Sequence, residues 1–69
     1  MTMLNLRING EARNFENVAT VAELIHALEL TGKRVAVERN GEIVPKSRHG
    51  ETLLQADDAL EIVVAVGGG

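Results

Sequence analysis

The spacing of apolar residues near the start of the chain predicts a strand. Every second position from residue 4 to residue 8 is apolar, which is typical of a strand with one buried face. These positions are Leu4, Leu6 and Ile8. The Asn9-Gly10 dipeptide that follows is typical of a type I′ turn, because both central residues of that turn take a positive φ. We therefore expect a hairpin whose second strand covers residues 11–16, with Phe15 on its inward side.

From Thr20 onward the apolar residues have the spacing of a helix. Thr20 and Glu23 have the spacing of a capping box, in which each side chain accepts a hydrogen bond from the backbone N–H of the other residue. One face of the predicted helix is apolar and should pack on the core. It carries Val21, Leu24, Ile25 and Leu28. We expect Gly32 to supply the left-handed residue that ends the helix, with the basic pair Lys33-Arg34 near its C-terminal dipole.

The second half of the chain predicts another hairpin and a last strand. Asn40-Gly41 is again a type I′ turn signal, and Pro45 stops the strand that follows because proline has no N–H to pair. After a turn at Asp57-Asp58, the strand over residues 60–66 has one core face and one outer face. The core face carries Leu60, Ile62, Val64 and Val66, and the outer face carries Glu61, Val63 and Ala65.

The order of elements is strand, strand, helix, strand, short strand and strand. It predicts an α+β fold in which the helix crosses one face of a mixed β-sheet. The crossover places the first and last strands side by side and parallel at the centre of the sheet. Val63 and Ala65 then lie opposite the core as exposed apolar residues, and we interpret them as a docking surface for a partner protein.

Composition narrows the classes of function. The 69 residues allow one domain with little room for an enclosed active site. The absence of cysteine excludes disulfides, thiolate metal sites and cysteine nucleophiles. A net charge of −3, seven scattered basic residues and one aromatic residue argue against nucleic-acid binding. No window approaches the roughly 20 apolar residues of a membrane span, so we expect a cytoplasmic protein. When free, it is expected to be a monomer.

Signals for side-chain chemistry are weak. We interpret His26 and His49 as solvated surface residues and not as metal ligands. Ser47, His49 and Asp57 are the residue types of a hydrolase triad, but the chain has no GxSxG motif. Asp57, Asp58 and Glu61 could attract a cation, but they lack the spacing of a calcium loop. We interpret Asp57-Asp58 as a solvated turn. Because no GxxxxGK motif occurs, we expect no stably bound ATP. We also expect no other bound cofactor and no metal.

The run Gly67-Gly68-Gly69 stands directly after the last strand and is the strongest functional signal. Glycine has no Cβ, so such a segment can enter a channel that is too narrow for side chains. We interpret residues 1–66 as the folded domain and residues 67–69 as a flexible tail. In this interpretation Gly67 and Gly68 thread into a partner, and Gly69 presents its carboxylate to the partner's active site. The alternative is a frayed terminus or a cloning scar.

Several segments, taken in order, carry a resemblance that covers essentially the whole chain. They are Asn9-Gly10-Glu11, Thr20-Val21-Ala22-Glu23-Leu24, residues 35–45 with an Ile-Val-Pro motif after their Asn-Gly turn, residues 58–63, and the final Gly68-Gly69. In these segments the chain resembles the ThiS family, the sulfur carrier proteins of thiamine (thiazole) biosynthesis. That family has the ubiquitin-like β-grasp fold and ends in Gly-Gly, so Gly67 is an additional glycine. The resemblance implies a carrier and not an enzyme.

The resemblance also implies partners. A ThiF-like adenylyltransferase would consume ATP to adenylate the Gly69 carboxylate, and a sulfur donor such as a cysteine desulfurase would supply the sulfur of a C-terminal thiocarboxylate. A ThiG-like thiazole synthase would receive that sulfur. Two alternatives stay open. One is a MoaD-like carrier for another acceptor, either a molybdopterin precursor or tRNA, and the other is a non-covalent ubiquitin-like binding module with an inert tail.

Overall fold

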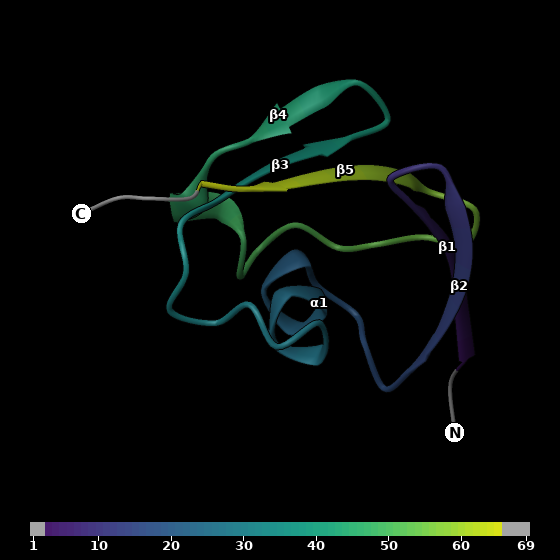
Figure 1. The fold of residues 1–69 in the computed structure, drawn as a ribbon. Coiled ribbons are helices and arrows are strands. Elements are labelled where there is room, and N and C mark those ends of the chain that lie inside the picture. Colours follow the sequence, from purple (N-terminus) through teal and green to yellow (C-terminus); the bar gives the residue numbers. More distant parts are fainter. Residues whose placement is uncertain (1–2, 66–69) are drawn as a thin grey trace.

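The chain is seen in a computed structural model that describes residues 3–65 (Figure 1). Within these residues, five strands form one mixed sheet in the order β2-β1-β5-β3-β4. The strands are β1 (Met3–Ile8), β2 (Glu11–Glu16), β3 (Val35–Arg39), β4 (Glu42–Val44) and β5 (Ala59–Val64). The helices are α1 (Val21–Ala27) and the short 3₁₀ helix η1 (Lys46–Arg48). Val66 and the predicted tail, residues 67–69, lie outside the described residues.

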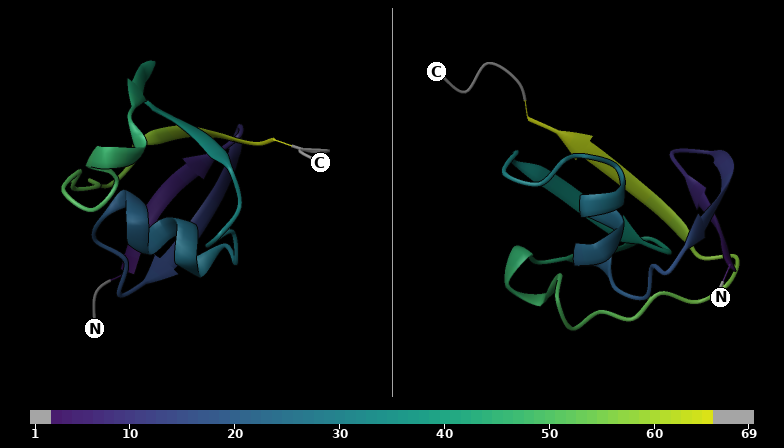
Figure 2. Two further views of the ribbon diagram at one scale, coloured as in Figure 1. Left: turned by 90° about the vertical axis from the view of Figure 1, so that its left-hand side faces the viewer. Right: turned by 90° about the horizontal axis from the view of Figure 1, so that it is seen from below.

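The strand β5 lies at the centre of the sheet, as the order of elements predicted. It runs parallel to β1, with Ile8 paired to Leu60, and antiparallel to β3 along the whole length of β3. The helix α1 lies against one face of the sheet, and the segment from η1 to β5 returns on the same side (Figure 1). The two further views agree with this arrangement (Figure 2). The predicted α+β architecture is therefore confirmed.

The core lies between α1 and the sheet. Val21 and Leu24 of α1 are fully buried, and Val37 and Leu60 of the two facing strands are each 1% exposed. Burying a valine or leucine side chain contributes about 1.5–3 kcal/mol, so these four residues account for a large part of the stability. The predicted apolar face of the helix and the inward position of Phe15 are both confirmed.

Both Asn-Gly turns have the backbone that the sequence predicted. Asn9 and Gly10 have φ values of 52° and 85°, and Asn40 and Gly41 have values of 51° and 87°. All four angles are positive, as a type I′ turn requires. The capping box is also present, because Thr20 Oγ1 accepts from the backbone N–H of Glu23 and the Glu23 carboxylate accepts from that of Thr20.

The end of α1 differs from the prediction. The left-handed residue that ends the helix is Glu29, with φ of 61°. Gly32 also has a positive φ, of 87°, but it lies three residues further on in the connection. The N–H of Glu29 donates to His26 O and the N–H of Leu30 donates to Ile25 O, which is the Schellman pattern. Leu30 packs partly buried against the core, so its apolar contact sets the end of the helix. In residues 3–65 no helix is long and apolar enough to cross a membrane.

Candidate functional site

The strand that leads to the glycine run is held on its β3 side up to the last described residue. Val63 pairs with Ala36 and Val64 pairs with Val35. One residue beyond β5, the N–H of Ala65 donates to Arg34 O at 2.9 Å. The point from which the tail continues is therefore fixed to the sheet by backbone hydrogen bonds.

The side chain of Asn9 holds β5 from the other side. Its Nδ2 donates to Ile62 O at 3.1 Å, and its Oδ1 accepts from the N–H of Ile62 at 2.8 Å. The side-chain amide of Asn9 thus makes the two hydrogen bonds to β5 that the backbone of a further β1 residue would otherwise make, and it does so directly after the end of β1. The same asparagine makes the type I′ turn, so one residue closes the first hairpin and fixes β5.

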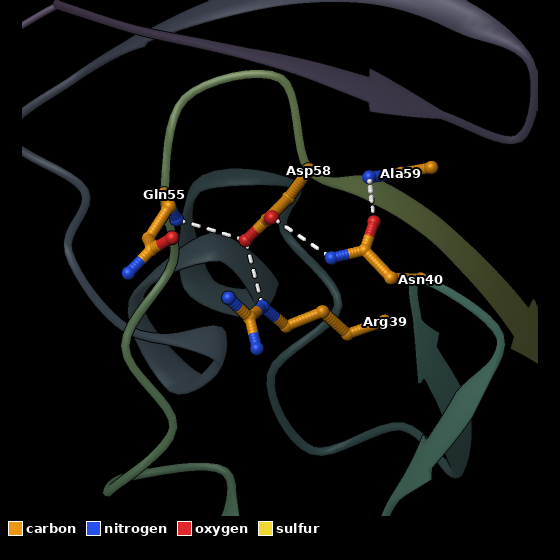
Figure 3. A network of polar contacts seen from close by, with 5 residues as sticks. All are labelled: Arg39, Asn40, Gln55, Asp58 and Ala59. Atoms are coloured by element: carbon orange, nitrogen blue, oxygen red, sulfur yellow. Dashed lines mark hydrogen bonds and ion pairs between the residues drawn. The ribbon is translucent and has the colours of Figure 1, made fainter.

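The start of β5 is held by a second asparagine and a buried aspartate (Figure 3). Asp58 Oδ2 accepts from Arg39 Nε at 2.7 Å and from the N–H of Gln55 at 2.8 Å, and its Oδ1 accepts from Asn40 Nδ2 at 2.9 Å. Asn40 Oδ1 in turn accepts from the N–H of Ala59 at 2.9 Å. Every oxygen of the two side chains is therefore used, and the turn between β3 and β4 is tied to β5.

This network changes the pKa of the Asp58 carboxyl group. Burial by itself raises its pKa, but the hydrogen bonds from Asn40, Gln55 and Arg39, together with the Arg39 charge, bring the pKa below its ordinary value. The carboxylate is therefore held in its ionised form. The predicted solvated turn at Asp57-Asp58 is right for the exposed Asp57 and wrong for Asp58, which is buried because its hydrogen-bond donors come from β3 and its own turn.

Exposed apolar side chains surround the end of β5. Val63 is 62% exposed and Ala65 is also exposed, as the alternation along the strand predicted. Ile43 of β4 is 76% exposed, and the exposed Ala36 of β3 is paired with Val63. The exposure of Val63 and Ala65 is therefore confirmed, while their role in docking stays a prediction. We call Val63, Ala65, Ala36 and Ile43 the outer apolar patch.

The other predicted candidates do not form a site. His26 is exposed, with Nδ1 3.4 Å from Thr31 Oγ1. His49 is buried, which contradicts its predicted solvation, because the turn after η1 places its Nε2 3.2 Å from Val44 O. Among the described residues, no hydrogen bond joins His49 to Ser47 or Asp57. Nor does the part of the chain from residue 3 to residue 65 contain a group of three or more potential metal ligands.

Sequence reasoning missed the side-chain roles of Asn9, Asn40 and Asp58. The Asn-Gly pairs indicated two turns, but glycine-containing turns do not specify what the asparagine amide contacts. Gly67, Gly68 and Gly69, the residues predicted to thread into a partner and to be modified, lie outside the described residues.

Known proteins match nearly the whole chain. The family model described as the ThiS family matches residues 6–69. The sulfur carrier protein ThiS of Bacillus subtilis is 40% identical over 65 residues, which are 93% of this chain and 98% of that protein. A thiazole synthase of Paramagnetospirillum magneticum is 48% identical over 66 residues, which are 96% of this chain but 20% of the synthase.

A solved structure gives the same result for the fold. The crystal structure of the thiamine biosynthesis protein ThiS from Geobacter metallireducens matches with a TM-score of 0.79 and 32% sequence identity. The match covers 96% of this chain and all of that one. The expected ubiquitin-like β-grasp fold is therefore confirmed.

Proposed function

The chain belongs to the ThiS family, and from this premise we propose that it carries sulfur for thiazole formation in thiamine biosynthesis. The observation that carries the proposal is the match to a sulfur carrier protein over nearly the full length of both chains. The anchored strand β5 supports it, because a carrier needs a rigid body from which a thin terminal segment extends. Its chemistry takes place in the active sites of its partners, so the chain itself is a carrier and not a catalyst.

The proposed chemistry takes place at the carboxylate of Gly69. A carboxylate is a poor acyl donor until one of its oxygens becomes part of a leaving group. A carboxylate oxygen therefore attacks the α-phosphorus of ATP, pyrophosphate leaves, and the acyl adenylate forms. Hydrosulfide or the terminal sulfur of a persulfide then attacks the acyl carbon, and AMP leaves. Hydrosulfide gives the terminal thiocarboxylate directly, whereas a persulfide gives an acyl disulfide, from which a thiol reductant releases the thiocarboxylate. ATP is bound by the activating enzyme, and this chain holds no stable cofactor.

Three partners follow from this sequence of steps. A ThiF-like adenylyltransferase activates Gly69, a donor such as a cysteine desulfurase supplies sulfur, and a ThiG-like thiazole synthase receives it. The thiazole synthase of Paramagnetospirillum magneticum contains a segment similar to this chain, which supports a thiazole synthase as the acceptor.

The outer apolar patch is the proposed contact with the activating enzyme. Three extended residues span only about 10 Å, so the folded body must sit against the enzyme for Gly69 to reach the adenylation site. Val63 and Ala65 are the members of the patch next to the tail, and exposed apolar contacts at the centre of an interface contribute most to binding.

Mass spectrometry tests the proposal. The protein is incubated with ATP and a ThiF-like enzyme, and then with a sulfur donor; we expect the masses of the adenylate and of the thiocarboxylate in turn. Gly68→Ala should fold normally yet lose most of the adenylation, because a methyl group clashes with a channel built for bare backbone. An unmodified wild-type mass throughout would contradict the carrier function and favour the binding module. Transfer to a molybdopterin precursor or tRNA in place of thiazole would identify the MoaD-like alternative.

A further inference from the structure

A hollow of about 540 Å³ lies beside the end of β5 and is lined both by residues of α1 and by residues of the outer apolar patch. Its apolar lining comes from four segments: α1, the connection that precedes β3, the start of β3, and the end of β5. The apolar residues of this lining are Ala22, Ile25, Leu30, Val35, Ala36, Val63 and Ala65. We call the hollow the tail-side groove. Its volume lies in the range of sites that receive a ligand or an inserted side chain.

The charged residues that line the tail-side groove are all positive. Lys33 and Arg34 line it from the connection before β3, and Lys46 lines it from η1. No aspartate or glutamate lines it, although the chain has ten acidic residues and a net charge of −3. Among the described residues, the ion pairs join Arg39 to Asp58 and Arg48 to Glu51, so they leave these three cations to the groove. The groove is therefore positive in a protein that is negative overall.

The position of the groove relates it to the tail. Ala65 and Val63 belong both to its lining and to the outer apolar patch, and Arg34 O accepts the last described backbone hydrogen bond of the chain, from Ala65. A protein that receives the residues after Ala65 must therefore lie over or beside the groove. The cations come from two different segments and border a mainly apolar lining, which fits an extended partner segment better than a compact anion such as a phosphate.

We propose that the tail-side groove receives an acidic segment of the activating enzyme, with an apolar side chain of that segment on the groove floor. This proposal rests on the carrier function proposed above, and it adds the charge and the place of the contact. Lys33, Arg34 and Lys46 are exposed, so they act mainly by attracting the partner during approach. Such attraction raises the association rate and is weakened by salt.

Single charge reversals test this proposal. Lys33 and Lys46 lie on different segments that line the groove, and each is replaced by glutamate in turn. Arg13→Glu on β2 is the matched control, since it makes the same change in charge outside the groove. In stopped-flow binding to a ThiF-like enzyme at low salt, we expect each groove variant to associate about fivefold more slowly than the control. At about 0.5 M salt the difference should largely disappear, because the Debye length falls to a few ångströms.

An NMR titration of the isotope-labelled protein gives an independent readout. On addition of the enzyme, the amide signals of Ala22, Leu30 and Gly32 should shift or broaden. Unaffected signals there, or association rates of Lys33→Glu and Lys46→Glu equal to that of Arg13→Glu, would overturn the groove proposal. Shifts of the same signals on addition of AMP alone would also overturn it, in favour of a small anion. If wild type is adenylated in these cases the carrier function stands, whereas a wild type that is neither bound nor adenylated overturns both.

Discussion

Replacing Asp58 by asparagine should destabilise the fold by about 2–3 kcal/mol, although the two side chains have almost the same shape. The carboxylate accepts three hydrogen bonds with its two oxygens, from Arg39, Gln55 and Asn40. An amide has one oxygen and one NH₂ group, so in either orientation at least one donor faces another donor. Rotating the Asn40 amide does not relieve this conflict, because its NH₂ would then face the N–H of Ala59.

The size of the effect follows from the burial of Asp58 and the exposure of its partner. A hydrogen bond to a charged group contributes about 1.5–3 kcal/mol, and the side chain of Asp58 is only 7% exposed. The Arg39 side chain is 28% exposed, so solvent screens part of the ion pair and the total stays near the middle of that range. A domain of this size has roughly 3–10 kcal/mol of stability in all. The melting temperature should therefore fall by about 10–20 °C.

Thermal and urea denaturation followed by circular dichroism measure this change, and Asp57→Asn is the matched control. Asp57 lies in the same turn, is exposed and has φ of 70°, a conformation that asparagine also tolerates. The control removes the same charge and should change the stability by less than about 0.5 kcal/mol. Equal midpoints for the two variants would refute the claim that the Asp58 network holds the start of β5.

The pH dependence gives a second check. Because the folded protein lowers the pKa of Asp58, folding favours the ionised form. The stabilisation is present above the pKa of an unfolded aspartate, about 3.9, and is lost as the pH falls through the lower pKa of the folded state. The difference between wild type and Asp58→Asn should therefore shrink below about pH 4. A difference that stays constant through this range would contradict the assignment.

Three other changes test separate parts of the structure. Leu60→Ala should cost about 2–5 kcal/mol by leaving a cavity, while the 65% exposed Leu53→Ala should change the urea midpoint little; equal midpoints would show that Leu60 is not core. Glu29→Gly should stabilise by about 0.5–1 kcal/mol, because glycine adopts the left-handed conformation after α1 without strain, and a lower melting temperature would contradict this account. Val63→Asp should keep a native circular dichroism spectrum yet weaken binding to a ThiF-like enzyme at least about tenfold. The control for that titration is Met3→Asp, an exposed apolar site on β1, and an unchanged affinity of Val63→Asp would place the docking surface elsewhere.

Local signals in the sequence determined most of the fold. The turns at Asn9-Gly10 and Asn40-Gly41, the capping box of Thr20 and the alternation that exposes Val63 all depend on residues within a few positions of one another. The physical reason is that φ preferences, capping and strand alternation act over one turn or one strand. The same local rule failed after α1, because the apolar contact of Leu30 with the core set the end of the helix and put Glu29, not a glycine, in the left-handed conformation.

The contacts that fix β5 were decided only by the tertiary structure. Asn9 and Ile62 are 53 positions apart, and Asp58 is 19 positions from Arg39, so no spacing in the sequence indicates that they meet. His49 also contacts a distant segment, because its backbone carbonyl accepts a hydrogen bond from the N–H of Ala22 in α1, 27 positions earlier. Lys33 and Arg34 are neighbours in the sequence, but Lys46 lies 12 positions after Arg34 and joins them only because η1 and the connection before β3 line the same groove. Hydrogen bonds between distant segments, and the grouping of their charges, arise only when the sheet and the helix pack together. The spacing of residues along the chain determines only the individual strands, turns and helix.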